Sequence, residues 1–331
     1  MARAGGAAAK RLPGGTEEDM VTRVAWLYYK EKLTQAQIGD QVFLSRQKVQ
    51  RYLEKARDQE VIRFTLKHPV ANLLGIEERL RERFGLKDAV VVPTPGGDVS
   101  ALRHSFAMAG AQYLERLLAA SGDFVLGVGW GNTTAYLADY FEPERPGGDA
   151  KVVSLIGNLM VNVSMNPFLT GQALASRLGC PFYNIWAPAI AQTRERAEVF
   201  KSEPWIHEVI EIARKADINI FSIGEVSRSA SLFQMGYLTG RDLGRLLGKG
   251  AVGDILGRFF DDTGAEIEDE VHERVIGIPL KSLRAPSKTC IAVAGGASKT
   301  SAIAAAIRRK YFNVLITDET TAADLLGRRE S

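Results

Sequence analysis

The strongest constraint on the fold of this chain is an alternation of short Val- and Ile-rich runs with longer segments of helical periodicity. The runs that predict strands are Ala89–Val92, Phe124–Gly127, Lys151–Leu155, Ile218–Ile223, Val275–Ile278, Thr289–Val293 and Asn313–Ile316. The helical segments that separate several of them are Leu102–Ala119, Pro167–Leu178, Pro204–Lys215 and Ser298–Arg309. Strands that alternate with helices predict an α/β fold with a mainly parallel sheet.

A different pattern precedes residue 67. Apolar residues recur at helical spacing within Met20–Lys30. Thr34 and Ser45 are typical helix N-caps, and they predict two short helices, Gln35–Gln41 and Arg46–Arg57. Two short helices joined by a tight turn behind a longer helix form the helix-turn-helix arrangement.

The second short helix has a basic outward face. Between Ser45 and Arg57 there are five Lys/Arg and one Glu, whereas Val49 and Tyr52 are expected to point inward. The residues predicted to contact DNA are Thr34, Gln35, Ser45, Arg46, Gln47, Lys48, Gln50 and Arg51. Long donors on such a helix can reach phosphates and base edges in the major groove. The alternative is an amphipathic helical hairpin whose basic face is simply solvated.

Two positions bear on how these helices cross. Gly39 is the small residue expected where they touch. The turn commonly contains a glycine, which accepts positive φ, but this chain has Phe43 there, so the tilt of the second helix is left open. The stretch Glu60–Leu66 alternates well enough to predict a short strand, half of a wing beside the helices.

Composition adds a weak charge bias. The 331 residues carry a net charge of +3, and residues 1–66 hold 12 Lys/Arg against 8 Asp/Glu, which weakly favours a nucleic-acid partner. Cys180 and Cys290 stand in no metal-ligand spacing, and no apolar run approaches the ~18 residues that span a bilayer. We therefore expect a cytoplasmic protein with no metal site and no membrane contact.

Three predicted strands end in glycine, in the stretches VLGVGWGNTT (125–134), SIGEVS (222–227) and AGGASK (294–299). A dinucleotide fingerprint would need glycine where Asn132 stands, and an acidic residue after the next strand, which is followed by IGNLMVNVSMN. Both requirements fail, and the chain has no G-x-x-x-x-G-K-[ST] loop. No nucleotide cofactor is expected.

The same residues suit a single phosphate. The groups expected to contact it are the backbone of Gly129 and Gly131, the side chains of Asn132, Thr133 and Thr134, and the ammonium of Lys299. The alternative is that Thr133 and Thr134 only cap a helix predicted over Thr134–Tyr140.

The motifs LTQAQIGDQVFLSRQKVQRYLEKARDQEVIRF, GVGWGNTTAYL, WAPAI, GDILGRFFDDTG, RVIGI and AGGASKTSAIAAAI…NVLITDETTAADLL occur in this order along the chain. Together they resemble the SorC/DeoR-type sugar-binding transcriptional regulators. The resemblance implies an effector domain with a fold like that of ribose-5-phosphate isomerase and glucosamine-6-phosphate deaminase. It also implies a phosphorylated sugar ligand and a homo-oligomer, a dimer or tetramer.

Carried over residue by residue, the resemblance adds Gly224 to the effector site and gives Asp254 or Asp261 a role in binding sugar hydroxyls. Some relatives form a Schiff base through a lysine after the strand that follows the phosphate loop. Here that region reads GNLMVNVSMNP and has no lysine, so covalent capture at that place is not expected.

The predicted organisation has four parts. They are a disordered tail (1–19), a winged helix-turn-helix domain (20–66), a linker with a connecting helix over Leu73–Phe84 (67–88), and a sugar-phosphate-binding and oligomerisation domain (89–331). The predicted function is a transcriptional regulator of a carbohydrate or polyol operon. Its predicted partners are double-stranded operator DNA, a phosphorylated sugar or polyol, and further copies of itself.

The alternative function is a sugar-phosphate isomerase or deaminase, which needs a carboxylate or histidine poised for proton transfer. Candidate carboxylates are Glu225, the pair Asp261–Asp262 and the pair Asp318–Glu319. Each has a simpler use, because Glu225 can orient a hydroxyl, the Asp pair stands in a turn and Asp318 can cap the next helix. The four histidines are scattered. We therefore expect no enzymatic activity.

Overall fold

The computed structural model describes residues 16–59, 61–62, 69–94, 99–143, 149–159 and 166–328. The chain divides into two compact units, Met1–His68 and Pro69–Ser331. We call them the helical unit and the α/β unit, and each is described by itself.

The helical unit contains α1 (Glu17–Tyr29), α2 (Gln35–Val42) and α3 (Arg46–Asp58). The predicted caps of α2 and α3 are confirmed, because Thr34 and Ser45 accept hydrogen bonds from backbone N–H groups in the first turns. The helices pack around buried apolar side chains, among them Val21, Val24, Ile38, Val49 and Leu53.

The expected tail over 1–19 extends too far. Thr16 and Asp19 form a capping box in which each side chain accepts a hydrogen bond from the other residue's backbone N–H, so α1 begins at Glu17. Residues 1–15 lie outside the described part of the chain. Of the predicted wing strand only Val61 and Ile62 are described, and they form a bend rather than a strand.

The crossing of α2 and α3 requires a glycine. A Cβ on Gly39 would lie 2.6 Å from the carbonyl oxygen of Leu44, so the predicted small-residue contact is confirmed. In the turn, Phe43 adopts the left-handed conformation with φ 56°, and its side chain is 83% exposed. The turn therefore takes the usual backbone conformation, although a phenylalanine occupies the position where glycine is common.

The α/β unit is built on a seven-stranded sheet with the order β1-β10-β9-β5-β2-β3-β4. The strands are β1 (Asp88–Val92), β2 (Phe124–Val128), β3 (Ala150–Ser154), β4 (Phe182–Tyr183), β5 (Ile218–Phe221), β9 (Thr289–Val293) and β10 (Val314–Asp318). Every pairing in this sheet is parallel. The predicted α/β class is confirmed.

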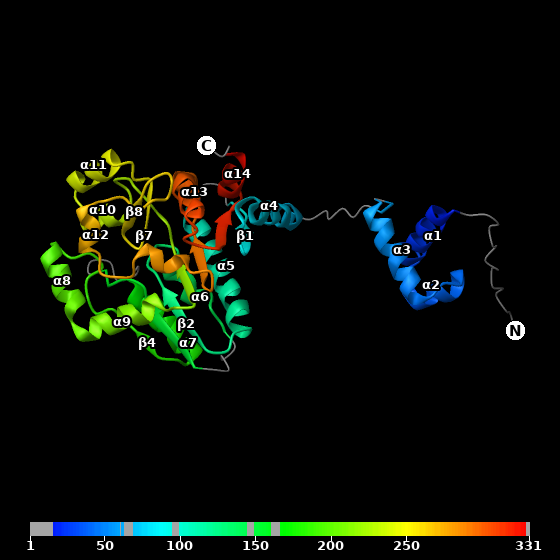
Figure 1. The fold of residues 1–331 in the computed structure, drawn as a ribbon, viewed down its shortest axis with the longest axis horizontal. Coiled ribbons are helices and arrows are strands. Elements are labelled where there is room, and N and C mark those ends of the chain that lie inside the picture. The colour runs from blue at the N-terminus through cyan, green and yellow to red at the C-terminus, as the bar shows by residue number, and fades with distance from the viewer. Residues whose placement is uncertain are drawn as a thin grey trace. The chain divides into compact units, whose positions relative to one another are not determined.

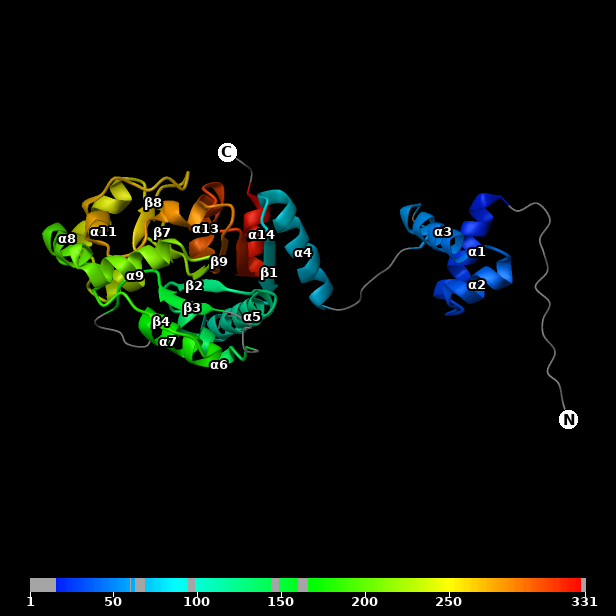
Figure 2. The ribbon, with the colours of Figure 1, turned by 60° about the horizontal axis from the view of Figure 1, so that its bottom comes forward.

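Helices cover both faces of this sheet (Figures 1 and 2). On one face lie α5 (Val99–Ala119), α6 (Leu137–Tyr140) and α7 (Pro167–Leu178), and on the other lie α4 (Pro69–Phe84), α9 (Pro204–Arg214), α13 (Thr300–Arg308) and α14 (Glu319–Gly327). Successive strand residues point to opposite faces. Val92 and Val152 accordingly belong to the core on the α5 side, and Val91 and Val153 to the core on the α13 side.

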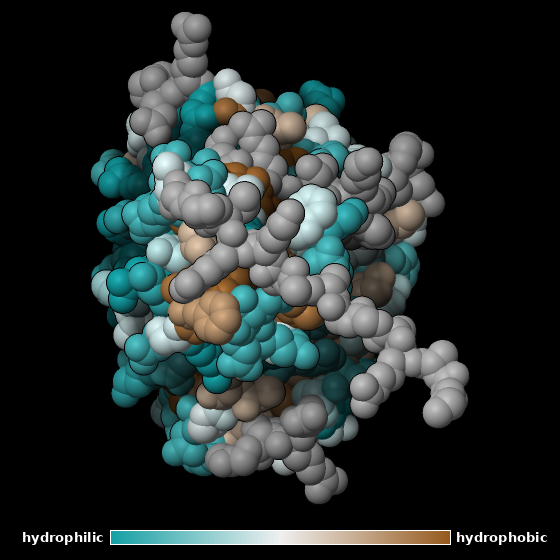
Figure 3. Space-filling model, turned by 90° about the vertical axis from the view of Figure 1, so that its right-hand side faces the viewer, coloured by the Kyte–Doolittle hydropathy of each residue, from teal (hydrophilic) through white to brown (hydrophobic). Residues whose placement is uncertain are grey.

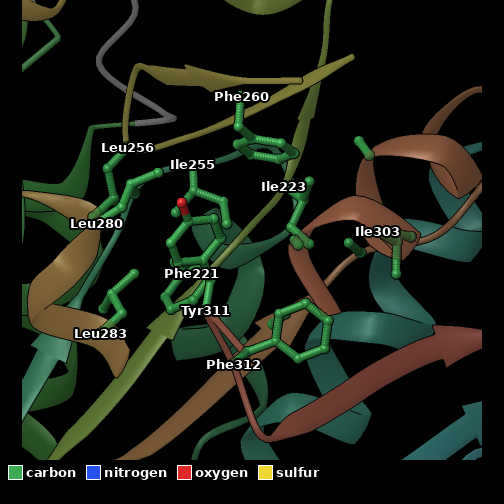
Figure 4. Close-up of a cluster of buried hydrophobic side chains, with 14 of the residues drawn as sticks. Phe221, Ile223, Ile255, Leu256, Phe260, Leu280, Leu283, Ile303, Tyr311 and Phe312 are labelled. Atoms are coloured by element: carbon green, nitrogen blue, oxygen red, sulfur yellow. The ribbon is translucent and has the colours of Figure 1, made fainter. Parts of the chain in front are cut away.

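A second, three-stranded antiparallel sheet was not predicted. It consists of β6 (Gly224–Glu225), β7 (Gly253–Ile255) and β8 (Arg258–Phe260). The β7–β8 hairpin turns at Leu256 and Gly257, which both have positive φ. Side chains of this hairpin pack with Phe221 and Ile223 in the buried cluster shown in Figure 4. The remaining helices are α8 (Arg194–Ser202), α10 (Ser231–Gln234), α11 (Gly240–Gly248) and α12 (Glu270–Arg274).

Two further predictions about segments need correction. Val275–Ile278 is not a strand, because Val275 and Gly277 each form only an isolated bridge to a different segment. The helix predicted in the linker 67–88 is α4, and it begins the α/β unit, where Leu73 and Leu80 are buried against the core. It is therefore part of the folded unit rather than a connector.

The described surface seen in Figure 3 is mostly hydrophilic, with hydrophobic side chains in small areas between polar ones. Scattered exposed apolar residues are ordinary on folded proteins. Among the described residues, no helix is both long and apolar enough to cross a membrane.

Candidate functional site

A cavity of about 540 Å³ lies at the carboxyl edge of the large sheet. Its walls come from the segments that follow β2, β5 and β9, which are neighbours in the sheet, and from one side of α5. From β2 the chain continues outward to β3 and β4, and it then returns to β5 on the other side of β2. Open α/β sheets bind ligands at such reversals of strand order.

The loop after β2 forms the first wall through Trp130, Gly131, Asn132 and Thr133. A Cβ on Gly131 would lie 2.5 Å from the hydroxyl oxygen of Ser222, so only glycine allows this approach to the segment after β5. Thr133 is buried and makes no side-chain capping bond, so the capping alternative is wrong for this residue. Thr133 lines the cavity.

Two residues of the predicted phosphate loop do not line the cavity. The N–H of Gly129 donates to the carbonyl of Ile220 at 2.8 Å, which completes the pairing of β2 with β5. The hydroxyl of Thr134 donates to the carbonyl of Gly131 at 3.2 Å, inside the loop. Gly129 and Thr134 therefore shape the loop, and their donors are already used.

The amide of Asn132 is also engaged. Its nitrogen donates to the hydroxyl of Ser231 at 3.2 Å, which connects the loop to the start of α10. Both residues line the cavity. This bond holds the loop after β2 and the segment after β6 at a fixed separation across the cavity.

The second wall contains Gly224 and Asp254, which face each other across the β6–β7 pair. A Cβ on Gly224 would lie 1.9 Å from a carboxylate oxygen of Asp254, so the glycine leaves room for the carboxylate. Burial raises the pKa of the Asp254 carboxyl to about 6, although the N–H of Gly257 and the charge of Lys299 favour ionisation. Asp254 is thus a buried carboxyl group at the cavity wall.

Asp261 does not reach the cavity, contrary to prediction. Its carboxylate accepts hydrogen bonds from the backbone and hydroxyl of Thr263 and from the N–H of Ala265. Those bonds stabilise the turn after β8, so Asp254 is the cavity carboxylate of the two predicted.

The third wall follows β9. Gly295 and Gly296 lead into a single 3₁₀ turn, Ala297–Lys299, which places Lys299 at the cavity. Burial lowers the pKa of the Lys299 ammonium, whereas Glu225 and Asp254 oppose this shift. Lys299, Glu225 and Asp254 therefore line one cavity, and the two carboxylates favour the charged form of the ammonium.

Arg103 was missed by the sequence prediction. It lies on α5, lines the cavity, and contributes to lowering the pKa of Lys299. Phe106 from the same helix adds an apolar surface. No sequence motif marks either residue. The signal that could have identified them is their place on the side of α5 that lines the cavity.

Glu225, a carboxylate considered for catalysis, lies in a cluster of hydroxyls. It accepts hydrogen bonds from Ser227 at 2.6 Å and Ser229 at 3.1 Å. Burial opposes its charged form, but these bonds, Ser298 and the charge of Lys299 hold its pKa below the usual range. Glu225 is therefore an ionised acceptor rather than a base near neutrality.

A second candidate surface is on α3 of the helical unit. Arg46, Gln47, Lys48, Gln50 and Arg51 are all exposed, whereas the side chains predicted to point inward are buried. The predicted orientation of the helix is confirmed. The hydroxyls of Thr34 and Ser45 instead accept from the backbone as caps, and Gln35 is half-buried.

An α/β unit with a cavity lined by polar and apolar side chains, joined to a helical unit with an exposed basic helix, defines a ligand-binding regulatory protein. The family model described as "Putative sugar-binding domain" matches residues 68–327. The transcriptional regulator LsrR of Enterobacter sp. (strain 638) is 35% identical over 315 residues, or 94% of each chain. The deoxyribonucleoside regulator of Bacillus subtilis (strain 168) is 32% identical over 312 residues, covering 94% of this chain and 98% of that protein. The full-length sorbitol operon regulator SorC from Klebsiella pneumoniae agrees in fold, with a TM-score of 0.72 and 23% identity over 93% of this chain and 98% of that one.

The chain therefore belongs to the SorC/DeoR-type family of sugar-binding transcriptional regulators, as its motifs predicted. It is a transcriptional regulator, and its family implies two partners, DNA and a sugar effector. Among the described residues, no group of His, Cys, Asp or Glu side chains is arranged to hold a metal ion.

Proposed function

We propose that this protein controls a carbohydrate or polyol catabolic operon, and that a phosphorylated sugar or sugar alcohol in the cavity sets its affinity for operator DNA. The observation that carries the proposal is the convergence of Gly131, Thr133, Asp254 and Lys299 on one cavity, from the loop after β2, from β7 of the small sheet and from the turn after β9.

The phosphate would lie between the loop after β2 and the 3₁₀ turn after β9. Lys299 and Arg103 supply positive charge there, and Thr133 supplies a hydroxyl. Asp254 and Glu225 can accept hydrogen bonds from sugar hydroxyls, and Phe106 offers a surface to the apolar face of the carbon chain. A few fixed polar groups in a partly apolar cavity are the usual basis of small-ligand specificity.

We propose that the helical unit is a helix-turn-helix domain with α3 as the recognition helix. Its exposed cations would contact phosphates and base edges in the major groove. Such domains act in pairs, so we propose a homodimer or homotetramer in which two helical units bind two half-sites of the operator. We also propose that the α/β unit shares the fold of ribose-5-phosphate isomerase and glucosamine-6-phosphate deaminase.

Helix α4 is the proposed route from the cavity to the helical unit, because it begins immediately after His68. The backbone N–H of Val91 in β1 donates to the Glu77 carboxylate of α4 at 2.8 Å. Arg83 donates to the carbonyls of Leu326 and Arg328 at the end of α14. A ligand that binds one arrangement of these contacts more tightly would shift the equilibrium between ways of pairing two helical units. A ligand that binds both arrangements equally would not change that equilibrium.

The first test is a thermal-shift screen of pentose, hexose and polyol monophosphates, each beside its unphosphorylated parent. We expect one phosphate to raise the melting temperature while its parent does not. The double variant Thr133→Ala/Lys299→Ala should lose this shift and the effector response, but it should keep operator binding without effector. A normal effector response in this variant would show that the cavity is not the effector site.

The second test separates DNA binding from effector binding. Arg51→Ala should weaken operator binding and reduce its salt dependence, because one cation that neutralises a DNA phosphate is lost. Its thermal shift with the sugar phosphate should equal that of the wild type. Glu54→Ala, on the same helix, is the matched control and should not weaken operator binding.

One observation favours a second function. Asp254 is buried at the cavity with a pKa of about 6, which is the range in which a carboxylate can act as a general base at neutral pH. An isomerase or deaminase would use such a group. A turnover assay on the phosphate found in the screen distinguishes the two functions, and we expect no product.

A further inference from the structure

Asp318 occupies the carboxyl end of β10, between the ends of β1 and β9. It is 1% exposed and accepts four hydrogen bonds. One oxygen accepts from the hydroxyl of Thr94, after β1, and from the N–H of Thr321, at 3.1 and 3.0 Å. The other accepts from the N–H of Gly296, after β9, at 3.0 Å and from the Thr321 hydroxyl at 2.6 Å.

The carboxylate is ionised at neutral pH. Burial opposes the charged form, but the bonds from Thr321, Gly296 and Thr94 hold the pKa of Asp318 below its usual range. An ionised acceptor makes shorter and stronger hydrogen bonds than a neutral one. The loops that follow β1 and β9, the two strands beside β10, are therefore held by one buried charge.

The backbone after β9 is shaped around this carboxylate. A Cβ on Gly295 would lie 2.3 Å from the Asp318 oxygen and 2.4 Å from the ring of Phe106. Gly296 has φ 98°, a conformation that other residues rarely adopt. Its N–H also donates to the Thr321 hydroxyl at 2.7 Å. Both glycines thus serve the contact with Asp318.

Lys299 follows within one 3₁₀ turn, since its N–H donates to the carbonyl of Gly296 at 2.9 Å. The place of its ammonium in the cavity consequently depends on where Gly296 is held. Asp318 itself does not line the cavity. Among the described residues, its hydrogen bond from Gly296 connects it to the cavity through the Gly295–Lys299 segment.

We propose that Asp318 is a positioning residue of the effector site, which fixes the Gly295–Lys299 turn so that the Lys299 ammonium meets the ligand phosphate. The inference rests on the proposed function of the cavity. The sequence left two roles open for Asp318, a helix cap and a catalytic acid, and the proposal gives it a third.

Asp318→Asn tests the charge. An amide retains one acceptor but turns an NH₂ group toward donors, so at least one charge-assisted bond is lost. We expect affinity for the sugar or polyol phosphate that most stabilises the wild type to fall about ten-fold, the equivalent of one such bond. Affinity for operator DNA without effector should not change.

Thr321 provides a milder pair of variants in case Asp318→Asn does not fold. Thr321→Val keeps the shape but removes the hydroxyl that bonds both Asp318 and Gly296, whereas Thr321→Ser keeps that hydroxyl. We expect weaker phosphate binding in Thr321→Val and wild-type binding in Thr321→Ser. Equal phosphate affinity in Thr321→Val, Thr321→Ser and wild type would overturn the inference.

A readout without ligand separates this inference from the proposed function. In the full-length protein, the labelling rate of Lys299 by an amine-reactive reagent can be followed by mass spectrometry. We expect faster labelling in Asp318→Asn and Thr321→Val than in wild type and Thr321→Ser. If no phosphate binds the wild type, the proposed function fails and labelling alone decides; unchanged labelling would overturn the role of Asp318.

Discussion

The two units place their functional groups in opposite ways. On α3 the groups for a polyanionic partner are exposed side chains of one helix, close together in sequence. At the cavity, Thr133, Asp254 and Lys299 come from segments far apart in sequence and lie in a largely buried setting. A DNA surface needs long, solvated donors, whereas a small ligand needs few groups held precisely. The units should therefore respond differently to substitution.

The largest contrast is expected from Gly39→Ala. The new Cβ would meet the backbone carbonyl of Leu44 at 2.6 Å, which a rotamer change cannot relieve. The helical unit has a small core, so overpacking by about 1–3 kcal/mol should unfold it. Operator binding and hydrogen-exchange protection of α3 should be lost, while sugar-phosphate binding in the α/β unit should remain.

Gly75→Ala is the matched control, because a Cβ on this glycine of α4 meets nothing within 4 Å. Alanine favours a helix over glycine by about 1 kcal/mol, so this variant should be neutral or more stable. Loss of sugar-phosphate binding in Gly39→Ala would mean that the two units do not fold independently.

The second prediction concerns the buried charge at the cavity. Asp254 has a pKa raised from 3.8 to about 6, so its contribution to stability is fully present below pH 4 and is lost as the pH rises through 6. Asp254→Asn removes this dependence. Relative to wild type, the ligand-free variant should gain up to about 3 kcal/mol between pH 4 and pH 7. Chemical denaturation across this range measures the gain.

Asp261→Asn is the control for that prediction. Burial opposes its charge, but the bonds from Thr263 and Ala265 hold the pKa of Asp261 below its usual range. Its contribution is therefore present at neutral pH and lost in acid, so Asp261→Asn should destabilise the protein at pH 7. Equal pH dependence of the two variants would contradict the placement of Asp254 at the cavity and Asp261 in a turn.

The same contrast explains what could be predicted from sequence. Three features of the helical unit depend on residues close together in the chain, so the local sequence pattern predicts them. They are the caps Thr34 and Ser45, the inward face of α3 and the contact at Gly39. Six of the seven strands of the large sheet were likewise found from local apolar runs, whereas β4 and the three-stranded sheet were missed. The antiparallel pairing of Gly224 with Asp254 depends on residues 30 positions apart, and no local signal announces it.

The errors at the candidate site share this origin. Asp254 and Asp261 stand in one motif, but Asp254 lines the cavity, whereas the Asp261 carboxylate is bonded within the turn after β8. Gly129 was expected to bind phosphate, but its N–H is used in the pairing with β5. Arg103 could be assigned to the cavity only from the position of α5 over the strand ends. Each depends on tertiary structure rather than on residue type.

The smallest effect is expected at Phe43, the exposed residue of the α2–α3 turn. Its φ of 56° costs a non-glycine residue about 1 kcal/mol, and its 83% exposed ring gains little from packing. Phe43→Gly should remove this cost and stabilise the helical unit. The net gain should be below about 1 kcal/mol, because glycine loses more conformational entropy on folding. Hydrogen exchange of α3 amides in the full-length protein measures the change.

Phe43→Ala removes the ring but keeps the strained φ, so it should give no gain. If Phe43→Ala stabilises the unit as much as glycine does, the exposed ring and not the backbone is the source of the cost. A stabilised Phe43→Gly head that still binds operator normally would show that recognition depends on α3 alone.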